Sequence, residues 1–206
     1  MILAKNLSHS KGNKVLFRQV SFNLQPGQRV LVQGANGAGK STLLKIMAGL
    51  LSPDQGQVTY QGHPLHKDVA NYFNHMSYLG HQNSLKKSLT PIENVKELLC
   101  LANAKASDLQ IQALLDELGL KAHKHQLSET LSAGECRKVA LAGVILKNKL
   151  LWILDEPFTS LDKASYEKLQ IQCLHHLKQG GMILLSCHMG SHHYEGAHVV
   201  QLSKVP

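Results

Sequence analysis

A glycine-rich segment that directly follows an apolar strand pattern is the feature that most constrains the fold of this chain. Residues 34–42 read Gly-Ala-Asn-Gly-Ala-Gly-Lys-Ser-Thr and match the pattern G-x-x-x-x-G-K-[ST]. The pattern over 28–33 predicts a strand, and the pattern from Ser41 onward predicts a helix. In such a loop, successive backbone N–H groups turn toward phosphate at a helix N-terminus. The segment therefore predicts a phosphate-binding loop at the first turn of an α/β unit.

The residues of this loop, called the P-loop from here on, have distinct expected roles. Lys40 would reach the β- and γ-phosphates of ATP, and the Ser41 hydroxyl would hold Mg²⁺. The predicted nucleotide-binding set is the complete loop: Gly34, Ala35, Asn36, Gly37, Ala38, Gly39, Lys40, Ser41 and Thr42. A glycine-rich turn without a ligand is the alternative reading of the pattern.

A second apolar run ends in two adjacent carboxylates. Residues 150–157 read Leu-Leu-Trp-Ile-Leu-Asp-Glu-Pro, which is typical of a buried strand followed by a loop. We expect Asp155 to hold Mg²⁺ and Glu156 to activate the attacking water. A strand that ends in solvated charge would also fit this run. Because the acidic pair follows the P-loop in the chain, the two motifs together predict a nucleoside triphosphatase.

Composition excludes several other classes of protein. The chain has 206 residues and 43% apolar residues, enough for a substantial core in one domain. Its formal charge of +8 is spread along the sequence and forms no basic tract, so we expect no nucleic-acid partner. The longest uncharged apolar run, 139–146, is shorter than the ~20 residues of a membrane helix. The N-terminus lacks the pattern of a secretory signal, so we expect a cytosolic chain.

The cysteines and histidines do not form a recognisable metal-binding pattern. The four cysteines lack C-x-x-C spacing, which predicts reduced structural thiols. The 13 histidines include the pairs 175–176 and 192–193, but adjacent positions of a helix point in different directions. We therefore favour surface or core histidines over a metal or haem site.

The pattern of elements predicts one domain with a helical insertion. Alternating residues up to about 60 predict antiparallel strands around the first parallel strand, with a turn at 25–28. Thr90-Pro91-Ile-Glu93 predicts the start of a helix, and Ser107 starts a second one that ends at Gly119 and places Leu109, Leu114, Leu115 and Leu118 near one face. We expect a core of about 1–83 and 147–206 and a helical subdomain of about 84–146.

The segment Leu131-Ser-Ala-Gly-Glu135 resembles the Leu-Ser-Gly-Gly-Gln signature of the ATPase subunits of ATP-binding cassette (ABC) proteins. Three further features follow the order of that family: Gln82 after a strand, residues 160–162 after the acidic pair, and His188 after the last core strand. The resemblance covers essentially the whole chain. It implies an α/β P-loop NTPase of the ABC type, with a parallel-sheet core, an N-terminal antiparallel β-subdomain and an inserted α-helical subdomain.

The resemblance also implies catalysis that involves two copies of the chain. ABC ATPase subunits form an ATP-dependent head-to-tail dimer in which each signature contacts the nucleotide bound by the other copy. That implied set is Ser132, Ala133, Gly134 and Glu135, and the implied coupling loop is Ser160, Leu161 and Asp162. Gln82 would sense Mg²⁺ and the attacking water, and His188 would contact the γ-phosphate. The implied catalytic set is thus Glu156, His188 and Gln82, and the implied Mg²⁺ set is Ser41, Gln82 and Asp155.

Three positions depart from the ABC pattern. Glu135 replaces the signature Gln, and Gly143 stands where an Arg is common. Lys11 occupies the position of the aromatic residue that stacks on adenine, which leaves Lys11 or Phe17 as a weaker contact to the base.

Finer likeness points to one branch of the family. Tyr78-Leu-Gly-His-Gln82, the Leu-Ser-Ala-Gly signature and the segment 151–162 are similar to the ATPase subunits of cytochrome c maturation systems. This likeness implies a peripheral subunit on the cytoplasmic face of the inner membrane, with an integral-membrane permease as partner and no direct haem binding. An ATPase for lipoprotein release or cell division is an alternative. A soluble ABC ATPase of translation or chromosome maintenance is another, although such proteins carry two cassettes or long coiled coils.

Overall fold

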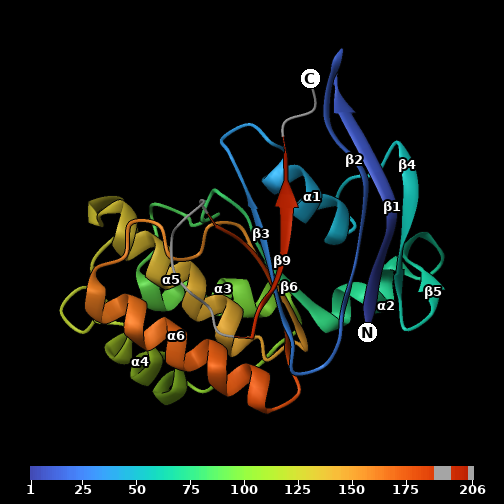
Figure 1. Ribbon diagram of the computed structural model, residues 1–206. Helices are drawn as coiled ribbons and strands as arrows, with labels where there is room; N and C mark the ends of the chain where they lie inside the picture. Colours follow the sequence, from blue (N-terminus) through green and yellow to red (C-terminus); the bar gives the residue numbers. More distant parts are fainter. Residues whose placement is uncertain (188–195, 204–206) are drawn as a thin grey trace. The chain divides into compact units, whose positions relative to one another are not determined.

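The structure is a computed structural model that describes residues 1–187 and 196–203. The chain divides into two compact units (Figure 1). The first unit comprises Met1–Gly80, Leu150–Glu156 and His176–Pro206, and the second comprises His81–Lys149 and Pro157–His175.

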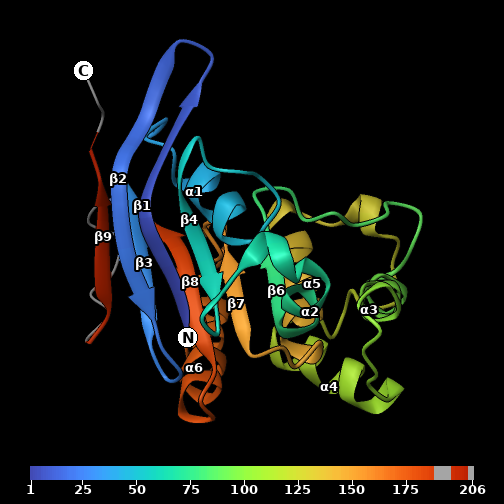
Figure 2. The ribbon, with the colours of Figure 1, turned by 90° about the vertical axis from the view of Figure 1, so that its right-hand side faces the viewer.

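Four strands of the first unit form an antiparallel sheet in the order β2-β1-β4-β5, which Figures 1 and 2 show from two sides. They are β1 (Ile2–Lys11), β2 (Lys14–Leu24), β4 (Gln55–Tyr60) and β5 (His63–Pro64). In the turn after β2, the Gln28 N–H donates to the Gln25 carbonyl at 3.0 Å. The antiparallel strands and the turn predicted before the P-loop are therefore confirmed.

The other five strands of the first unit form a parallel sheet in the order β6-β7-β8-β3-β9. They are β3 (Arg29–Gly34), β6 (Met76–Leu79), β7 (Leu151–Leu154), β8 (Met182–Cys187) and β9 (His198–Leu202). Parallel strands have their carboxyl ends at one edge of the sheet, where open α/β sheets bind ligands. The P-loop after β3, Asp155 after β7 and the end of β8 therefore share that edge.

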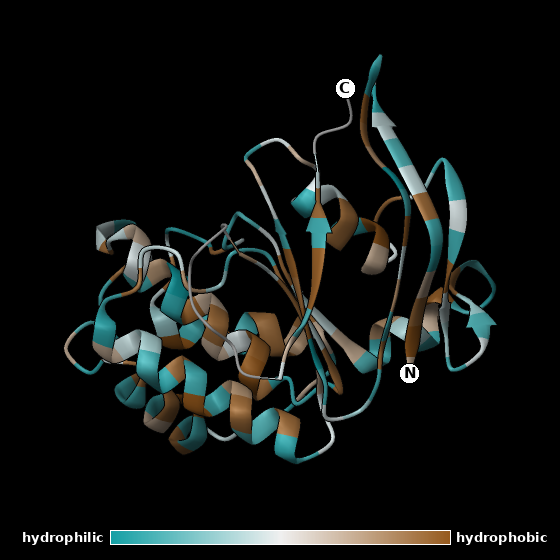
Figure 3. Cartoon of the chain, in the orientation of Figure 1, coloured by the Kyte–Doolittle hydropathy of each residue, from teal (hydrophilic) through white to brown (hydrophobic). Residues whose placement is uncertain are grey.

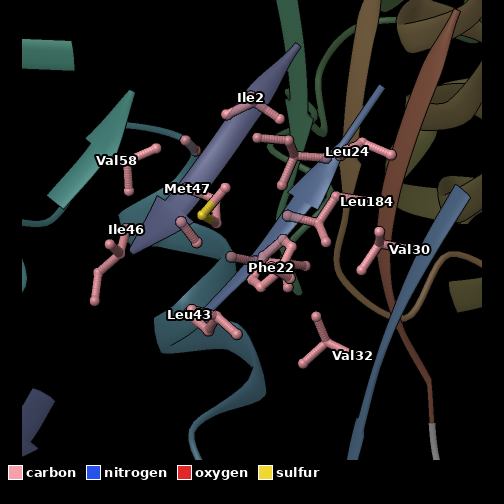
Figure 4. Packing of buried hydrophobic residues seen from close by; sticks show 14 of the residues in the cluster. Ile2, Phe22, Leu24, Val30, Val32, Leu43, Ile46, Met47, Val58 and Leu184 are labelled. Atoms are coloured by element: carbon pink, nitrogen blue, oxygen red, sulfur yellow. The ribbon is translucent and has the colours of Figure 1, made fainter. Parts of the chain in front are cut away.

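Helix α1 (Lys40–Met47) joins both sheets of the first unit in one apolar core. Figure 3 shows hydrophobic residues concentrated on the parallel strands, and Figure 4 shows Leu43, Ile46 and Met47 of α1 among side chains of both sheets. Burying each such side chain contributes about 1.5–3 kcal/mol. Helix α2 (Val69–His75), which follows the short 3₁₀ turn η1 (Leu65–Lys67), is tied to α1 because the Tyr72 hydroxyl donates to the Met47 carbonyl at 2.6 Å. Helix α1, whose first residues belong to the P-loop, is thus packed into the core of the first unit.

The second unit is helical and has its own apolar cluster, built from α3, α4 and α5. Its elements are α3 (Pro91–Leu101), α4 (Asp108–Glu117), η2 (Ser128–Thr130), α5 (Ala133–Leu146) and, from α6 (Lys163–Lys178), residues 163–175. Thr90 and Ser107 cap α3 and α4 with complete capping boxes. The predicted starts of both helices are therefore confirmed.

One predicted core residue of α4 is wrong. Leu109 is 80% exposed, whereas Ile111 is buried together with Leu114, Leu115 and Leu118. The buried positions follow the helical spacing i, i+3, i+4 and i+7, and Leu109 lies about 140° away from Leu114 around a helix of 3.6 residues per turn. Ile111, not Leu109, begins the apolar stripe.

Candidate ATP site

The P-loop connects β3 to α1 through backbone that only glycine accommodates well. Gly39 precedes the helix in the left-handed region with φ 97°, and a Cβ atom there would lie 3.0 Å from side-chain atoms of Leu16 and Phe17. A Cβ atom at Gly34 would lie 2.7 Å from the Leu202 carbonyl oxygen. These two glycines allow the loop to curl tightly against β2 and β9. The loop therefore presents the N-terminus of α1, as a phosphate site requires.

The Lys40 side chain is folded over the loop. It is 6% exposed, and its Nζ donates to the Gly34 carbonyl at 2.9 Å. The same nitrogen lies 4.0 Å from Oε1 of Glu156. The structure thus brings Lys40 and Glu156, predicted from separate motifs, to one place at the sheet edge.

The acidic pair is held by a serine that the sequence reasoning missed. Asp155 is 1% exposed, its N–H donates to the Leu79 carbonyl at 2.7 Å, and its Oδ1 accepts the Ser186 hydroxyl at 2.6 Å. The Glu156 N–H donates to Ser186 Oγ at 2.9 Å, and Glu156 has a φ of 49°. Ser186 follows four apolar residues on β8 and belongs to no motif, so only its position next to β7 could have identified it.

Cys187, the next residue of β8, contacts β3, the strand that leads into the P-loop. Cys187 Sγ accepts the Gln33 side-chain amide at 3.5 Å. Burial raises the pKa of the Cys187 thiol above its ordinary value. At neutral pH this cysteine is a neutral thiol beside the site and does not resemble a reactive thiolate.

The signature residues lie at the start of α5 in the second unit. Ser132 caps the helix, and Glu135 completes the capping box by accepting the Ser132 N–H at 2.8 Å and the Ser132 hydroxyl at 2.7 Å. These hydrogen bonds from Ser132 hold the pKa of Glu135 below its ordinary value. His123 Nδ1 also lies 3.1 Å from Oε1 of Glu135. A Cβ atom at Gly134 would overlap the carbonyl oxygen of Ser160.

Asp162 fixes the segment that follows Ser160. Its carboxylate accepts the Ser165 N–H at 2.8 Å, the Ser165 hydroxyl at 3.0 Å and the Lys138 ammonium at 3.0 Å. The Ser165 N–H, followed by Lys138, holds the pKa of Asp162 well below its usual range. Within the second unit, the predicted coupling loop is therefore linked both to α6 and to the helix that begins with the signature.

Gln82 and His188 are the remaining predicted site residues. Gln82 is exposed in the bend that begins the second unit, so its approach to the P-loop stays a prediction. His188 lies outside the described residues.

Phe17 is wrong as a contact to the base. Its ring is 2% exposed and packs in the core of the first unit, so it has no face to offer a ligand. Lys11 is exposed at the end of β1, which leaves only Lys11 of the two residues weighed for adenine.

Trp152 is 3% exposed and stacks on His176 at 3.9 Å between ring centroids, so it lies in the interior of the first unit. Among the residues that the structure describes, no helix has both the length and the apolar character needed to cross a membrane.

The fold and this edge of the sheet define a class of protein, and comparison with known families identifies it. The family described as ABC transporter matches residues 17–159. The chain therefore belongs to the ABC transporter family and is one of its ATPases. A solved structure titled "Structure of ATP binding subunit of ABC transporter" is 28% identical, with a TM-score of 0.81 over 92% of this chain and 80% of that one. The predicted α/β fold of the ABC type is thus confirmed.

Relatives within the family are similar over nearly the whole chain. A Bordetella bronchiseptica protein named "Cytochrome c biogenesis ATP-binding export protein CcmA" is 39% identical over 196 residues, which are 95% of this chain and 86% of the relative. The protein of that name from Yersinia pseudotuberculosis is 40% identical over 188 residues, 91% of this chain and 86% of the relative. These identities place the chain in the family of cytochrome c biogenesis ATP-binding export proteins.

Proposed function

We propose that this chain is the ATP-hydrolysing subunit of a membrane transporter that serves c-type cytochrome biogenesis. The observation that carries the proposal is the 39% identity, over 95% of the chain, to a cytochrome c biogenesis ATP-binding export protein. The transported substrate would be bound by a membrane partner, since the site residues of this chain serve a nucleotide. Hydrolysis would supply the energy for haem export or for release of a haem-loaded chaperone.

The P-loop and the acidic pair would share the work of hydrolysis. The backbone N–H groups of residues 34–42 would surround the β- and γ-phosphates, with Lys40 neutralising their charge. Glu156 would accept a proton from the attacking water as the phosphate bond breaks. The 4.0 Å between Lys40 Nζ and Glu156 Oε1 supports this arrangement, because the residue that binds phosphate and the residue that activates water must meet at the γ-phosphate.

The donor atoms at the site fit Mg²⁺. The buried Asp155 carboxylate and the Ser41 hydroxyl are hard oxygen ligands of the kind that Mg²⁺ prefers, and the Gln82 amide oxygen would add a third. When bound, Mg²⁺ would neutralise charge that develops on the phosphate oxygens. The contribution of the chain is to hold the Asp155 carboxylate in one orientation before the nucleotide arrives.

A second copy of the chain would complete each site. Ser132, Ala133, Gly134 and Glu135 would face the nucleotide of the other copy, and Ser160, Leu161 and Asp162 would couple the two sites. A solved structure with 21% identity, titled as the dimeric post-hydrolysis state of an ATP-binding cassette, shares the fold with a TM-score of 0.82. The capped start of α5 supports a role for the signature, since helix N-termini attract phosphate.

The remaining partner would be an integral-membrane permease, and the chain would lie at the cytoplasmic face of the inner membrane. The word "export" in the names of the relatives supports this location. We expect neither nucleic acid nor haem to bind the chain directly.

A genetic experiment tests the pathway. Replacing the gene with one that encodes Lys40→Ala should abolish covalent c-type cytochromes while b-type cytochromes and growth without respiration persist, because only covalent haem attachment depends on this ATPase. Haem staining of membrane and periplasmic fractions after denaturing electrophoresis measures the effect, with the wild-type gene as the control. Normal c-type cytochromes in the Lys40→Ala strain would remove the pathway and leave an ABC ATPase for another exporter.

A further inference from the structure

We propose that Ser186 is a positioning residue for ATP hydrolysis, because its single hydroxyl group aligns both members of the acidic pair. This inference rests on the roles proposed above for Asp155 and Glu156. Ser186 is 0% exposed and lies on β8. β7 and β8 are paired up to Leu154 and Leu185, so Ser186 stands beside the point where the chain leaves β7.

The Ser186 hydroxyl donates one hydrogen bond and accepts another. It donates to Oδ1 of Asp155 at 2.6 Å and accepts the Glu156 N–H at 2.9 Å. A hydroxyl group has one proton to donate and can accept through its lone pairs, so both contacts can exist at once. A serine at this position therefore connects the proposed metal ligand to the backbone of the proposed general base.

The bond to Asp155 selects one orientation of the carboxylate. The torsion that rotates a carboxylate is broad, so packing alone defines it poorly. A short hydrogen bond from a hydroxyl to a charged oxygen is about twice as strong as a neutral one, and it fixes the plane of the group. Partners of this kind around metal ligands typically contribute about 10–100-fold to metal affinity or activity.

The bond from Glu156 stabilises a turn that glutamate does not adopt readily. With φ at 49°, Glu156 is in the left-handed region, which residues with a Cβ atom seldom occupy. The Ser186 oxygen accepts the Glu156 N–H within this turn, after β7 has ended. The same turn directs the Glu156 side chain toward Lys40. Loss of the Ser186 hydroxyl should therefore loosen the general base as well as the metal ligand.

Another buried serine of the same sheet provides a matched control. Ser77 lies on β6, is 2% exposed and pairs with Trp152 of β7. Within the described part of the chain, its hydroxyl has no hydrogen-bond partner. Removing the Ser77 hydroxyl changes the volume of the interior as much as removing that of Ser186, but it disturbs neither Asp155 nor Glu156.

The experiment compares Ser186→Ala, Ser186→Thr and Ser77→Ala with the wild-type chain. Steady-state kinetics should show that Ser186→Ala lowers kcat by about 10–100-fold while KM for ATP changes less than about threefold. Ser186→Thr keeps a hydroxyl and should recover kcat to within about threefold, and Ser77→Ala should match the wild type. Equal losses in Ser186→Ala and Ser186→Thr would overturn the proposal, because they would assign the effect to packing.

Two further measurements are independent of turnover. In the ADP complex, electron paramagnetic resonance should show Mn²⁺ bound about tenfold or more weakly by Ser186→Ala than by the wild type. Without any nucleotide, the Glu156 amide should exchange its hydrogen faster in Ser186→Ala, and Ser77→Ala should leave that rate unchanged. Wild-type Mn²⁺ affinity together with wild-type exchange at Glu156 would also overturn the proposal.

A fourth variant covers the case in which Ser186→Ala does not fold. Ser186→Cys keeps a side chain of similar shape but has only a weak donor, so its kcat should still fall at least about tenfold. A wild-type kcat in Ser186→Cys would overturn the proposal. Failure of the underlying roles looks different: Glu156→Gln would then turn over ATP as fast as the wild type, whatever the Ser186 variants do.

Discussion

Glu156 combines a charged side chain with a backbone conformation that disfavours it. Its φ of 49° costs of order 1–2 kcal/mol for a residue with a Cβ atom. Such outliers persist where the surrounding structure holds them, and they gather at functional sites. Here the hydrogen bond from the Glu156 N–H to Ser186 holds the turn, and Lys40 lies opposite the carboxylate. This geometry fits a general base whose side chain is directed away from β7 and toward Lys40.

The role of Glu156 is tested by removing only its basicity. Glu156→Gln should bind ATP as the wild type does but lose about 10²–10⁴-fold in turnover, because an amide does not accept the proton of the attacking water. Lys40→Ala should instead weaken ATP binding, since Lys40 covers the phosphate loop. Phosphate release and titration with a fluorescent ATP analogue separate the two effects. Near-normal hydrolysis by pure Glu156→Gln would assign the base elsewhere.

Some residues of the site could be read directly from the sequence, and others could not. The P-loop and the acidic pair are contiguous motifs, so their residue types alone indicate the chemistry. Ser186 acts only because β7 and β8 pair in one register, and no local pattern reveals that pairing. Phe17 differs from the prediction for a related reason: its side chain packs inward on β2, and strand alternation does not say which face a ligand will approach.

Local chemistry predicted the helix starts of the second unit well. Capping boxes at Thr90 and Ser107 depend on residues three apart, so they can be recognised without tertiary information. The buried stripe of α4 was harder to predict, because a prediction rotated around the helix axis includes Leu109 and omits Ile111.

Gly143, which stands where an Arg is common in ABC ATPases, is explained by helix packing. A Cβ atom there would lie 2.7 Å from the Leu98 side chain, so α3 and α5 approach closely at that point.

Asp162 immediately precedes helix α6 and accepts the Ser165 N–H of its first turn. Because hydrogen bonds from Ser165 and Lys138 depress the pKa of Asp162, the ionised carboxylate stabilises the fold above the unfolded-state pKa of about 3.9. Asp162→Ala should therefore lower the free energy of unfolding by about 1 kcal/mol at pH 7, which is typical of a lost helix cap. This difference should stay constant between pH 7 and pH 5 and shrink as pH falls below about 4.

Urea unfolding of the wild type and Asp162→Ala at several pH values checks this expectation. Asp162→Asn serves as the matched control, since asparagine also caps helices and loses only the charge. A deficit in Asp162→Ala that is as large at pH 3.5 as at pH 7 would show that the carboxylate does not act through its charge.

The order of strands in the parallel sheet brings together motifs that are far apart in the chain. In the order β6-β7-β8-β3-β9, β7 and β3 flank β8, so Asp155, Ser186 and the P-loop meet at one edge of the first unit. No local pattern of the sequence states this order. The strand β9 also escaped prediction, because its five residues have a short apolar core and follow a segment without a strong helix pattern.

At the scale of the whole molecule, the signature is expected to work only in a second copy of the chain. In the structure, the Ser132 hydroxyl donates its proton to Glu135 of the same chain. Binding of the γ-phosphate of another copy would have to replace that bond, and the ionised Glu135 would also repel the phosphate. Glutamine at this position keeps the capping box while removing the charge. Glu135 should therefore weaken an ATP-dependent dimer without preventing it.

Light scattering on Glu156→Gln, which retains ATP, measures the strength of the ATP-dependent dimer. Without nucleotide, the chain should have the mass of one copy, 22.7 kDa, and saturating ATP should double that mass. Adding Glu135→Gln should lower the ATP concentration at half-dimerisation by about tenfold, equivalent to about 1.4 kcal/mol, since the competing carboxylate is gone. Adding Ser132→Asn should prevent dimerisation, because asparagine preserves the helix cap but has no hydroxyl for the phosphate. A dimer of unchanged strength in all three proteins, or one that ignores ATP, would mean that the signature does not contact a nucleotide across the interface.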